Sequence, residues 1–504
     1  MISKIGFDSE KYLQQQSEAI LERINLFKGK LYLEFGGKLL YDYHASRVLP
    51  GYDHNIKIRL LQQIKDKIDI LLCIYSGDIA RGRIRGDFGI TYDADALKLI
   101  DSLREYGLDI RAVIITRFEN QSPVIGFKNK LEHRGIKVYL HYATKGYPTD
   151  INLIVSEEGY GKNPYIETEK PVVVVTGPGP GSGKLATCLS QLYHDYKKGL
   201  KSGYAKFETF PVWNLPLKHP VNIAYEAATS DLGDVNMIDP YHLSAYGESA
   251  VNYNRDIEMF PVLQRILKKI MGENLPYKSP TDMGVNRVGF AIIDDELVKE
   301  AAKQEIIRRY FRYNYEYILG LEKHQTLERV ILLMEELNLK PEDRLVVLPA
   351  RQAAERARNC DALHTACGAA IQLPDGTIIS GHNSSLMTAS SSMILNAIKH
   401  MAEIPDRIHL LSASIIEHIK TLKKDYLGLK QEIMDLEETL IALSISATSN
   451  PVAEVCMEKL KQLQDCEVHL TSIPSPGDEI GLRRLRVNLT ADANFPTKDL
   501  FLGR

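Results

Sequence analysis

A loop rich in glycine and proline directly follows an apolar run near the middle of this chain. The apolar run, residues 171–176, reads Pro-Val-Val-Val-Val-Thr, and the loop, residues 177–183, reads Gly-Pro-Gly-Pro-Gly-Ser-Gly. Lys184 follows, and the apolar spacing of residues 185–196 predicts a helix. A strand, a glycine loop, a lysine and a helix in this order are typical of a phosphate-binding loop. In such a loop the backbone N–H groups and the helix N-terminus face an anion.

The loop departs from the pattern G-x-x-x-x-G-K-[ST] at two places. Pro178 stands where the first glycine belongs, and a proline has no N–H group to donate. Leu185 stands where a hydroxyl normally ligates magnesium, and Ser182 is the nearby residue that could replace it. The alternative to anion binding is a glycine-rich turn that only packs. The expected phosphate ligands are Gly179, Gly181, Ser182, Gly183 and Lys184.

A second apolar run, residues 287–293, ends in Asp294 and Asp295. Nucleotide-hydrolysing folds use a strand that ends in carboxylates to place a ligand beside the magnesium ion. On this interpretation Lys184 neutralises phosphate charge as a catalytic residue, and Asp294 or Asp295 is a catalytic and metal-binding residue that holds Mg²⁺ through water. The alternative is that Asp294 caps a helix that begins near residue 296.

Arginines form a third candidate set. Residues 69–75 predict a buried strand, and arginines at alternating positions, with glycines between them, follow it. Ligands of parallel α/β sheets bind outside the carboxyl ends of the strands, where guanidinium groups suit phosphate or carboxylate. A solvated basic loop is the alternative. Arg351, after a predicted short strand at residues 345–348, is expected to bind an anion in the same way. The alternating arginines are Arg81, Arg83 and Arg85.

A further polar stretch, residues 227–242, holds three aspartates and a histidine. Such a set could line a metal or sugar site. Aspartate and asparagine are also ordinary turn formers, so a structural role is the favoured interpretation. His219, which stands beside a proline, is a weaker candidate for an acid or base, and a structural role is favoured there too.

Length and composition limit the class of protein. A chain of 504 residues is too long for one core, so two to four domains are expected. The net charge of −3 gives no electrostatic reason to expect nucleic acid or an anionic membrane as a partner. No apolar run approaches the roughly 18–20 residues that span a bilayer. The six cysteines lack a framework spacing and the N-terminus lacks a signal-peptide core, so we expect reduced thiols and a cytoplasmic location.

The N-terminal third alternates between predicted strands and helices, which indicates a parallel α/β sheet. We expect a Rossmann-like or P-loop-like fold for the N-terminal and middle regions and a mixed α+β domain at the C-terminus. Asp375 and Gly376 predict the turn of a hairpin over residues 366–379. Apolar spacing near the C-terminus predicts helices that pack within the chain or against a second copy. The expected domains are 1–168, 169–325, which can share the sheet of the first, and 326–504.

Six long runs are distinctive: residues 85–93, 158–163, 177–191, 234–240, 282–286 and 349–354. These runs resemble those of a bacterial protein family of unknown function, and the resemblance covers nearly the whole chain. It implies no catalytic residues. Some members of that family carry the label ATP-dependent peptidase, but this sequence contains neither an HExxH zinc motif nor a G-x-S-x-G nucleophile elbow.

These features favour a cytoplasmic enzyme that uses ATP or another nucleoside triphosphate with Mg²⁺. Its reaction would be phosphoryl transfer or ligation onto a small molecule, and its partner would be an anionic or phosphorylated ligand. One alternative is an enzyme that binds a phosphorylated metabolite without a triphosphate, which the missing hydroxyl at Leu185 favours. The other is a nucleotide sensor without catalytic activity.

Overall fold

A computed structural model describes residues 5–27, 29–85, 89–207, 210–360, 365–429 and 432–497 of the protein. The chain forms two compact units, Ser3–Ala302 and Lys303–Arg504. Each unit has its own sheet. Strands from both sides of residue 168 belong to the sheet of the first unit.

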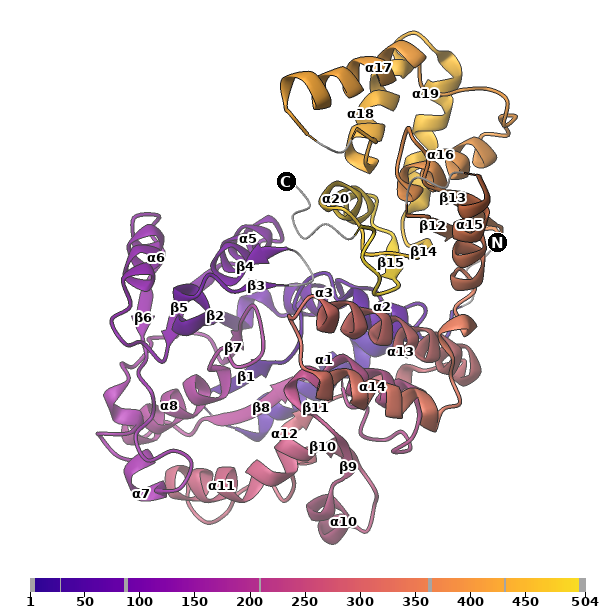
Figure 1. The fold of residues 1–504 in the computed structure, drawn as a ribbon. Helices are drawn as coiled ribbons and strands as arrows, with labels where there is room; N and C mark the ends of the chain where they lie inside the picture. Colours follow the sequence, from indigo (N-terminus) through magenta and orange to yellow (C-terminus); the bar gives the residue numbers. More distant parts are fainter. Residues whose placement is uncertain are drawn as a thin grey trace. The chain divides into compact units, whose positions relative to one another are not determined.

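The first unit is built on a seven-stranded sheet in which every neighbouring pair of strands is parallel (Figure 1). This sheet confirms the predicted α/β class. The central strand, β7, is the run of valines, and it is buried along its whole length, as parallel strands covered on both faces are. In spatial order the strands are β11 (Gly284–Val285), β8 (Gly203–Phe207), β1 (Leu31–Phe35), β7 (Val172–Thr176), β2 (Ile68–Tyr75), β5 (Ile110–Thr116) and β6 (Val138–Leu140).

Helices cover both faces of this sheet. One face packs against α5 (Tyr92–Glu105) and α6 (Ser122–Glu132). The other face packs against α8 (Lys184–Lys197) and α11 (Asn254–Met271). Successive residues of β2 alternate between the two cores, because side chains along a strand point to opposite faces.

The chain leaves the two neighbouring strands β7 and β2 in opposite directions. From β7 it crosses one face through α8 and returns as β8, and from β2 it crosses the other face through α5 and returns as β5. Such a divergence opens a crevice at the carboxyl ends of the two strands, where open α/β sheets bind their ligands. The loop of residues 177–183, called the glycine loop below, leaves β7 at this point.

The remaining elements of the first unit are further helices and two small hairpins. None of the described helices combines the length and apolarity needed to cross a bilayer. The helices are α1 (Ser9–Leu26), α2 (Tyr43–Val48), α3 (Ile56–Gln63), α4 (Ser76–Ala80), α7 (Ile151–Ile154), α9 (Pro220–Ala228), α10 (Pro240–Tyr246) and α12 (Pro280–Met283). The hairpins pair β3 (Ile84–Arg85) with β4 (Ile90–Thr91), and β9 (Asn236–Ile238) with β10 (Val251–Tyr253).

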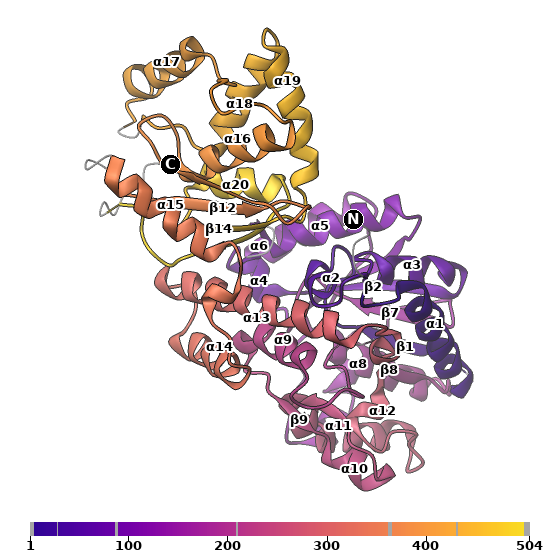
Figure 2. The same cartoon turned by 90° about the vertical axis from the view of Figure 1, so that its right-hand side faces the viewer.

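The second unit contains a mixed four-stranded sheet with helices on both faces (Figure 2). Its first two strands form the hairpin predicted from Asp375 and Gly376. The strands, in spatial order, are β13 (Ile378–His382), β12 (Gly368–Gln372), β14 (Glu467–Leu470) and β15 (Asn488–Ala491). The helices are α13 (Asp295–Ile318), which begins in the first unit, α14 (His324–Glu336), α15 (Val347–Cys360), α16 (Ala389–Met401), α17 (Ala413–Thr421), α18 (Leu436–Ala447), α19 (Pro451–Glu458) and α20 (Pro476–Arg484).

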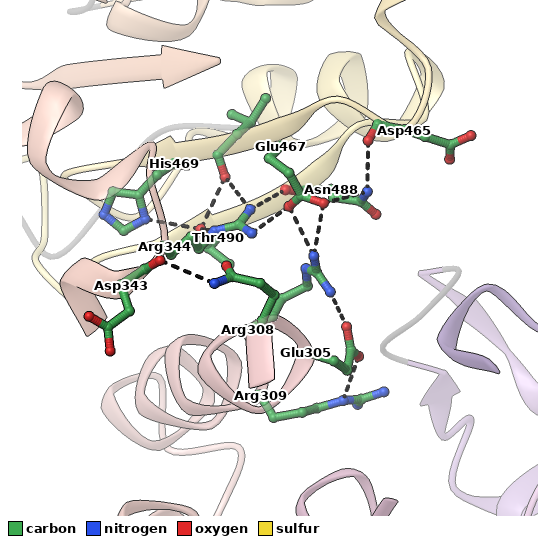
Figure 3. A network of polar contacts seen from close by, with 12 residues as sticks. Glu305, Arg308, Arg309, Asp343, Arg344, Asp465, Glu467, His469, Asn488 and Thr490 are labelled. Carbon is green, nitrogen blue, oxygen red and sulfur yellow. Dashed lines mark hydrogen bonds and ion pairs between the residues drawn. The ribbon is translucent and has the colours of Figure 1, made fainter. Parts of the chain in front are cut away.

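A buried network of arginines and carboxylates ties β14 and β15 to α13 (Figure 3). Arg344, only 1% exposed, pairs with Glu467 and donates to the Thr490 hydroxyl at 2.9 Å. Arg308 of α13 donates to both carboxylate oxygens of Glu467, at 2.9 and 3.0 Å. Burial opposes ionisation of Glu467, but Arg308 and Arg344 outweigh it and lower the pKa of this carboxyl to about 2.

Two predicted strands are wrong. Residues 287–293 contain the 3₁₀ turn Val288–Ala291, and the run at 345–348 leads into α15, which begins at Val347. Both runs are short and apolar, and such runs occur in buried helical turns as well as in strands. Pro349 is tolerated because it lies in the first turn of α15, where no N–H group is needed.

Glu467→Gln should destabilise the second unit at neutral pH and make less difference in acid. A folded-state pKa of about 2 lies below the ordinary 4.5, so the carboxylate contributes stability above pH 4.5 that is lost as the pH falls toward 2. Urea titrations at several pH values would measure the loss of stability, and hydrogen exchange would show whether it affects β14 and β15. An equal deficit of the variant at pH 7 and at pH 3 would contradict this account.

Candidate functional site

The glycine loop connects the end of β7 to the first turn of α8, so the predicted order of strand, loop and helix is confirmed. Gly181 has φ of 69° and Gly183 has φ of 88°, a left-handed conformation that glycine adopts without strain. Gly183 is the N-cap of α8, and the N–H groups of the first helical turn have no partner within the helix. The loop and the helix N-terminus together present backbone donors in the crevice.

The loop also packs tightly against neighbouring strand ends. A β-carbon on Gly183 would lie 2.7 Å from the Thr116 methyl group, and one on Gly179 would lie 2.5 Å from the ring of Tyr92. The Thr116 hydroxyl donates to the carbonyl of Ser182 at 2.8 Å. Packing therefore accounts for part of the glycine content, in agreement with the alternative that the sequence left open.

Lys184 turns back over the glycine loop. Its side chain is largely buried, and Nζ donates to the carbonyl of Gly179 at 3.2 Å and to the hydroxyl of Ser182 at 3.3 Å. The structure thus brings the predicted ligands Gly179, Ser182 and Lys184 together. The ammonium group places a full positive charge among the backbone donors of the loop, where an anion would gain from it.

Hydroxyl groups near the loop differ in what they already contact. Thr187 is buried within α8 and accepts a hydrogen bond from the Cys73 thiol at 3.5 Å. Ser182 is the hydroxyl inside the loop, and it contacts Lys184. Thr176, the last residue of β7, is buried, and its Oγ1 has no hydrogen-bond partner in the described part of the chain. A buried hydroxyl without a partner at the mouth of a crevice is a position where a ligand or a water can bind.

Arg117 is a site residue that the sequence analysis missed. It follows β5 directly, has a φ of 51°, and donates from its guanidinium to the carbonyl of Gly181 at 2.6 Å. The same guanidinium lies 3.6 Å from the centre of the Tyr75 ring. A non-glycine residue with positive φ carries strain, which persists at sites that the surrounding structure fixes. The rule that ligands lie beyond the carboxyl ends of strands, applied to the apolar run that forms β5, could have identified it.

The predicted arginines lie beyond the carboxyl end of β2. The Arg81 and Arg83 guanidiniums are each 3.5 Å from the buried carboxylate of Asp78, and both side chains are mostly exposed. Arg81 lies 6.0 Å from the centre of the Tyr75 ring, and Arg83 lies 5.4 Å from that of Tyr92. Tyr75 also contacts Arg117, and Tyr92 faces Gly179, so Arg81 and Arg83 belong to the same edge of the sheet. The side chain of the third predicted arginine, Arg85, lies outside the described residues.

Asp294 and Asp295 stand at the start of α13. The carboxylate of Asp294 accepts the backbone N–H of Leu297 at 3.0 Å, so Asp294 caps α13, as the alternative interpretation expected. Asp295 is 2.8 Å from Lys299 and 2.9 Å from Nε2 of His219, and these two groups lower the pKa of the Asp295 carboxyl. Within the described ranges neither aspartate has a polar contact with the glycine loop. Their predicted magnesium and catalytic roles stay predictions.

Arg351 lies in α15 of the second unit, not beyond a strand. Its guanidinium donates to Asp492 at 2.9 and 3.1 Å and to Glu342 at 2.5 Å. The guanidinium of Arg351, which was predicted to bind an anion, therefore already pairs with two carboxylates. Its role in binding a ligand stays a prediction.

Two of the three aspartates of residues 227–242 have structural contacts. Asp239 caps α10 and accepts the Thr281 hydroxyl at 2.6 Å, and Asp234 pairs with Arg255 at 3.2 Å. Over the described residues, no group of three or more histidine, cysteine, aspartate or glutamate side chains is arranged to hold a metal ion.

Comparison with known proteins identifies the family. The model of the domain of unknown function DUF1846, N-terminal, matches residues 5–338, and that of its C-terminal counterpart matches residues 342–501. The UPF0371 protein of Clostridium botulinum (strain Kyoto / Type A2) is 60% identical over 499 residues, which are 99% of each chain. The UPF0371 protein of Clostridium tetani (strain Massachusetts / E88) is 59% identical over the same length and coverage. The chain belongs to the DUF1846 family, as the resemblance in its sequence indicated.

Gly183→Ala should destabilise the first unit more than Gly181→Ala. Both substitutions put a side chain at positive φ, which costs roughly 1–2 kcal/mol. At Gly181 an added methyl group would meet open space, whereas at Gly183 it would meet Thr116. Overpacking of this kind adds roughly 1–3 kcal/mol. Thermal unfolding of the two variants measures the difference, and equal melting temperatures would show that the loop does not pack on β5 as described.

Proposed function

We propose that this protein is an enzyme that binds a nucleoside triphosphate at the glycine loop and uses it for phosphoryl transfer or ligation onto a small molecule. The observation that carries the proposal is the place of the loop. It leaves the central strand of a parallel sheet at the point where the connections of two neighbouring strands diverge, and it leads into a helix N-terminus. Ligand sites in such sheets form at this point.

The chemistry of the loop supports phosphate as the group that binds there. The N–H groups of residues 181–184 and the ammonium of Lys184 would bind phosphate oxygens, since both kinds of donor pair well with anions. Arg117 would hold the loop in shape through the Gly181 carbonyl. Arg81 and Arg83, beyond the neighbouring strand, would bind a second anionic group.

Magnesium, when bound with the triphosphate, would neutralise charge that develops on the transferred phosphoryl group. Of the residues in the loop, Ser182 supplies a hydroxyl that suits this ion, and Leu185 supplies none. This difference favours a second candidate function, an enzyme that binds a phosphorylated metabolite without a triphosphate. A nucleotide sensor without turnover would bind its ligand at the same loop, and assays of product formation distinguish it from the two enzymes.

Lys184→Ala should weaken the binding of ATP by at least about tenfold, a loss of roughly 1.4 kcal/mol. The reason is that the substitution removes the ammonium group that is hydrogen-bonded to Gly179 and Ser182 of the loop. Lys197→Ala is the matched control, because it removes the same charge from an exposed position at the other end of α8. Isothermal titration calorimetry with ATP, with and without Mg²⁺, measures both variants.

The outcomes separate the candidate functions. Equal affinity of the two variants for ATP would overturn the assignment of the loop. Binding of glucose 6-phosphate that depends on Lys184 and not on Mg²⁺, without binding of ATP, would favour the metabolite enzyme. ATP binding without release of phosphate or formation of product with any acceptor would favour the sensor.

A further inference from the structure

A hollow in the surface lies beside the first residues of the glycine loop, and its empty volume of about 430 Å³ includes the open solvent above it. Gly177 and Pro178 form one wall, the segment after β1 forms the second, and α5 forms the third. Side chains of α5 pack on the face of the sheet opposite α8. Because the pocket shares a wall with the glycine loop, a molecule bound in it would lie next to the phosphates of a bound nucleotide.

A buried ion pair builds the wall that follows β1. The Lys57 side chain is 1% exposed, and its Nζ contacts the Asp42 carboxylate at 2.8 Å and the backbone carbonyl of Lys38 at 3.0 Å. Tyr41, between these residues, has φ of 55°, and its N–H donates to Asn55 at 3.3 Å. A buried lysine is costly unless it is paired and hydrogen-bonded, so this arrangement fixes the wall before any ligand binds.

The lining of the pocket combines positive charge with apolar surface. Lys38 and Lys98 contribute two cations and Asp95 one carboxylate, and leucines form much of the remaining wall. The Lys98 ammonium lies 5.9 Å from the centre of the Tyr41 ring. The Thr176 hydroxyl, which has no partner among the described residues, points toward the same side. Thr176 pairs with Leu72 of β2, whose side chain packs toward α5, so both lie on the face of the sheet that carries the pocket.

We propose that this pocket binds the acceptor substrate, a small organic molecule whose phosphate or carboxylate group is held by Lys38 and Lys98. The leucine side chains would contact the apolar part of the acceptor, in the manner of ligand sites where a few polar groups fix orientation. This inference rests on the proposed function, because it takes the glycine loop to be the site of the phosphoryl donor.

Pyridoxal 5′-phosphate is the probe for this proposal. Its aldehyde condenses with a lysine amine to an imine with loss of water, its phosphate tests the preference for anions, and borohydride reduction fixes the product for peptide mass spectrometry. We expect the full chain to be labelled at Lys38 or Lys98 about tenfold more than at the exposed residues Lys130 and Lys197, a ratio worth roughly 1.4 kcal/mol. Pyridoxal, which lacks the phosphate, should show no such preference.

Competition identifies the anion and separates this proposal from the assignment of the glycine loop. Protection of Lys38 and Lys98 by inorganic phosphate would identify a phosphate acceptor, and protection by malonate a carboxylate acceptor. Protection of Lys184 by ATP tests the glycine loop in the same sample, so the two proposals fail separately.

Lys98→Met, with its melting temperature as the control for folding, should lower the labelling of Lys38. Labelling at the level of the surface lysines, or labelling that neither anion reduces, would overturn the proposal.

Discussion

The burial of β7 at the centre of the parallel sheet is the constraint on which the candidate site depends. Four consecutive valines form this strand and are inaccessible to solvent. Fully burying a side chain of this size stabilises a fold by roughly 1.5–3 kcal/mol. A strand that is apolar on both faces must lie between two layers of helices, so the polar loop at its end must emerge at the edge of the sheet. The glycine loop stands where it does for this reason.

The neighbouring strands then shape the loop. Thr116 and Arg117, at the end of β5, hold the carbonyls of Ser182 and Gly181, and Tyr92 of α5 limits the size of residue 179. Lys184 closes the loop from the side of α8. The loop is thereby fixed before a ligand arrives, and a pre-formed set of donors loses less entropy on binding an anion.

Local sequence patterns predicted the strands and helices that carry the site. They failed where contacts between residues distant in sequence determine the structure. The valine run, the glycine loop and the helix after it follow from spacing and composition alone. The run at residues 287–293 reads equally well as a strand or as a buried turn, and its contacts with N-terminal residues make it a turn. Arg117 joins the loop across a separation of 64 residues, which no local pattern contains. Lys38 and Lys98 line the same pocket for a similar reason, because their segments are brought together by the order of the strands.

The central claim is that the glycine loop binds the phosphates of a nucleoside triphosphate. A crystal structure of the protein with a non-hydrolysable ATP analogue and Mg²⁺ tests it most directly. The account predicts phosphate oxygens within hydrogen-bond distance of the N–H groups of residues 181–184, with the Lys184 ammonium turned from Gly179 toward them. A glycine loop that keeps the Lys184 contacts and holds no phosphate at saturating analogue, or an analogue bound elsewhere in the molecule, would contradict it.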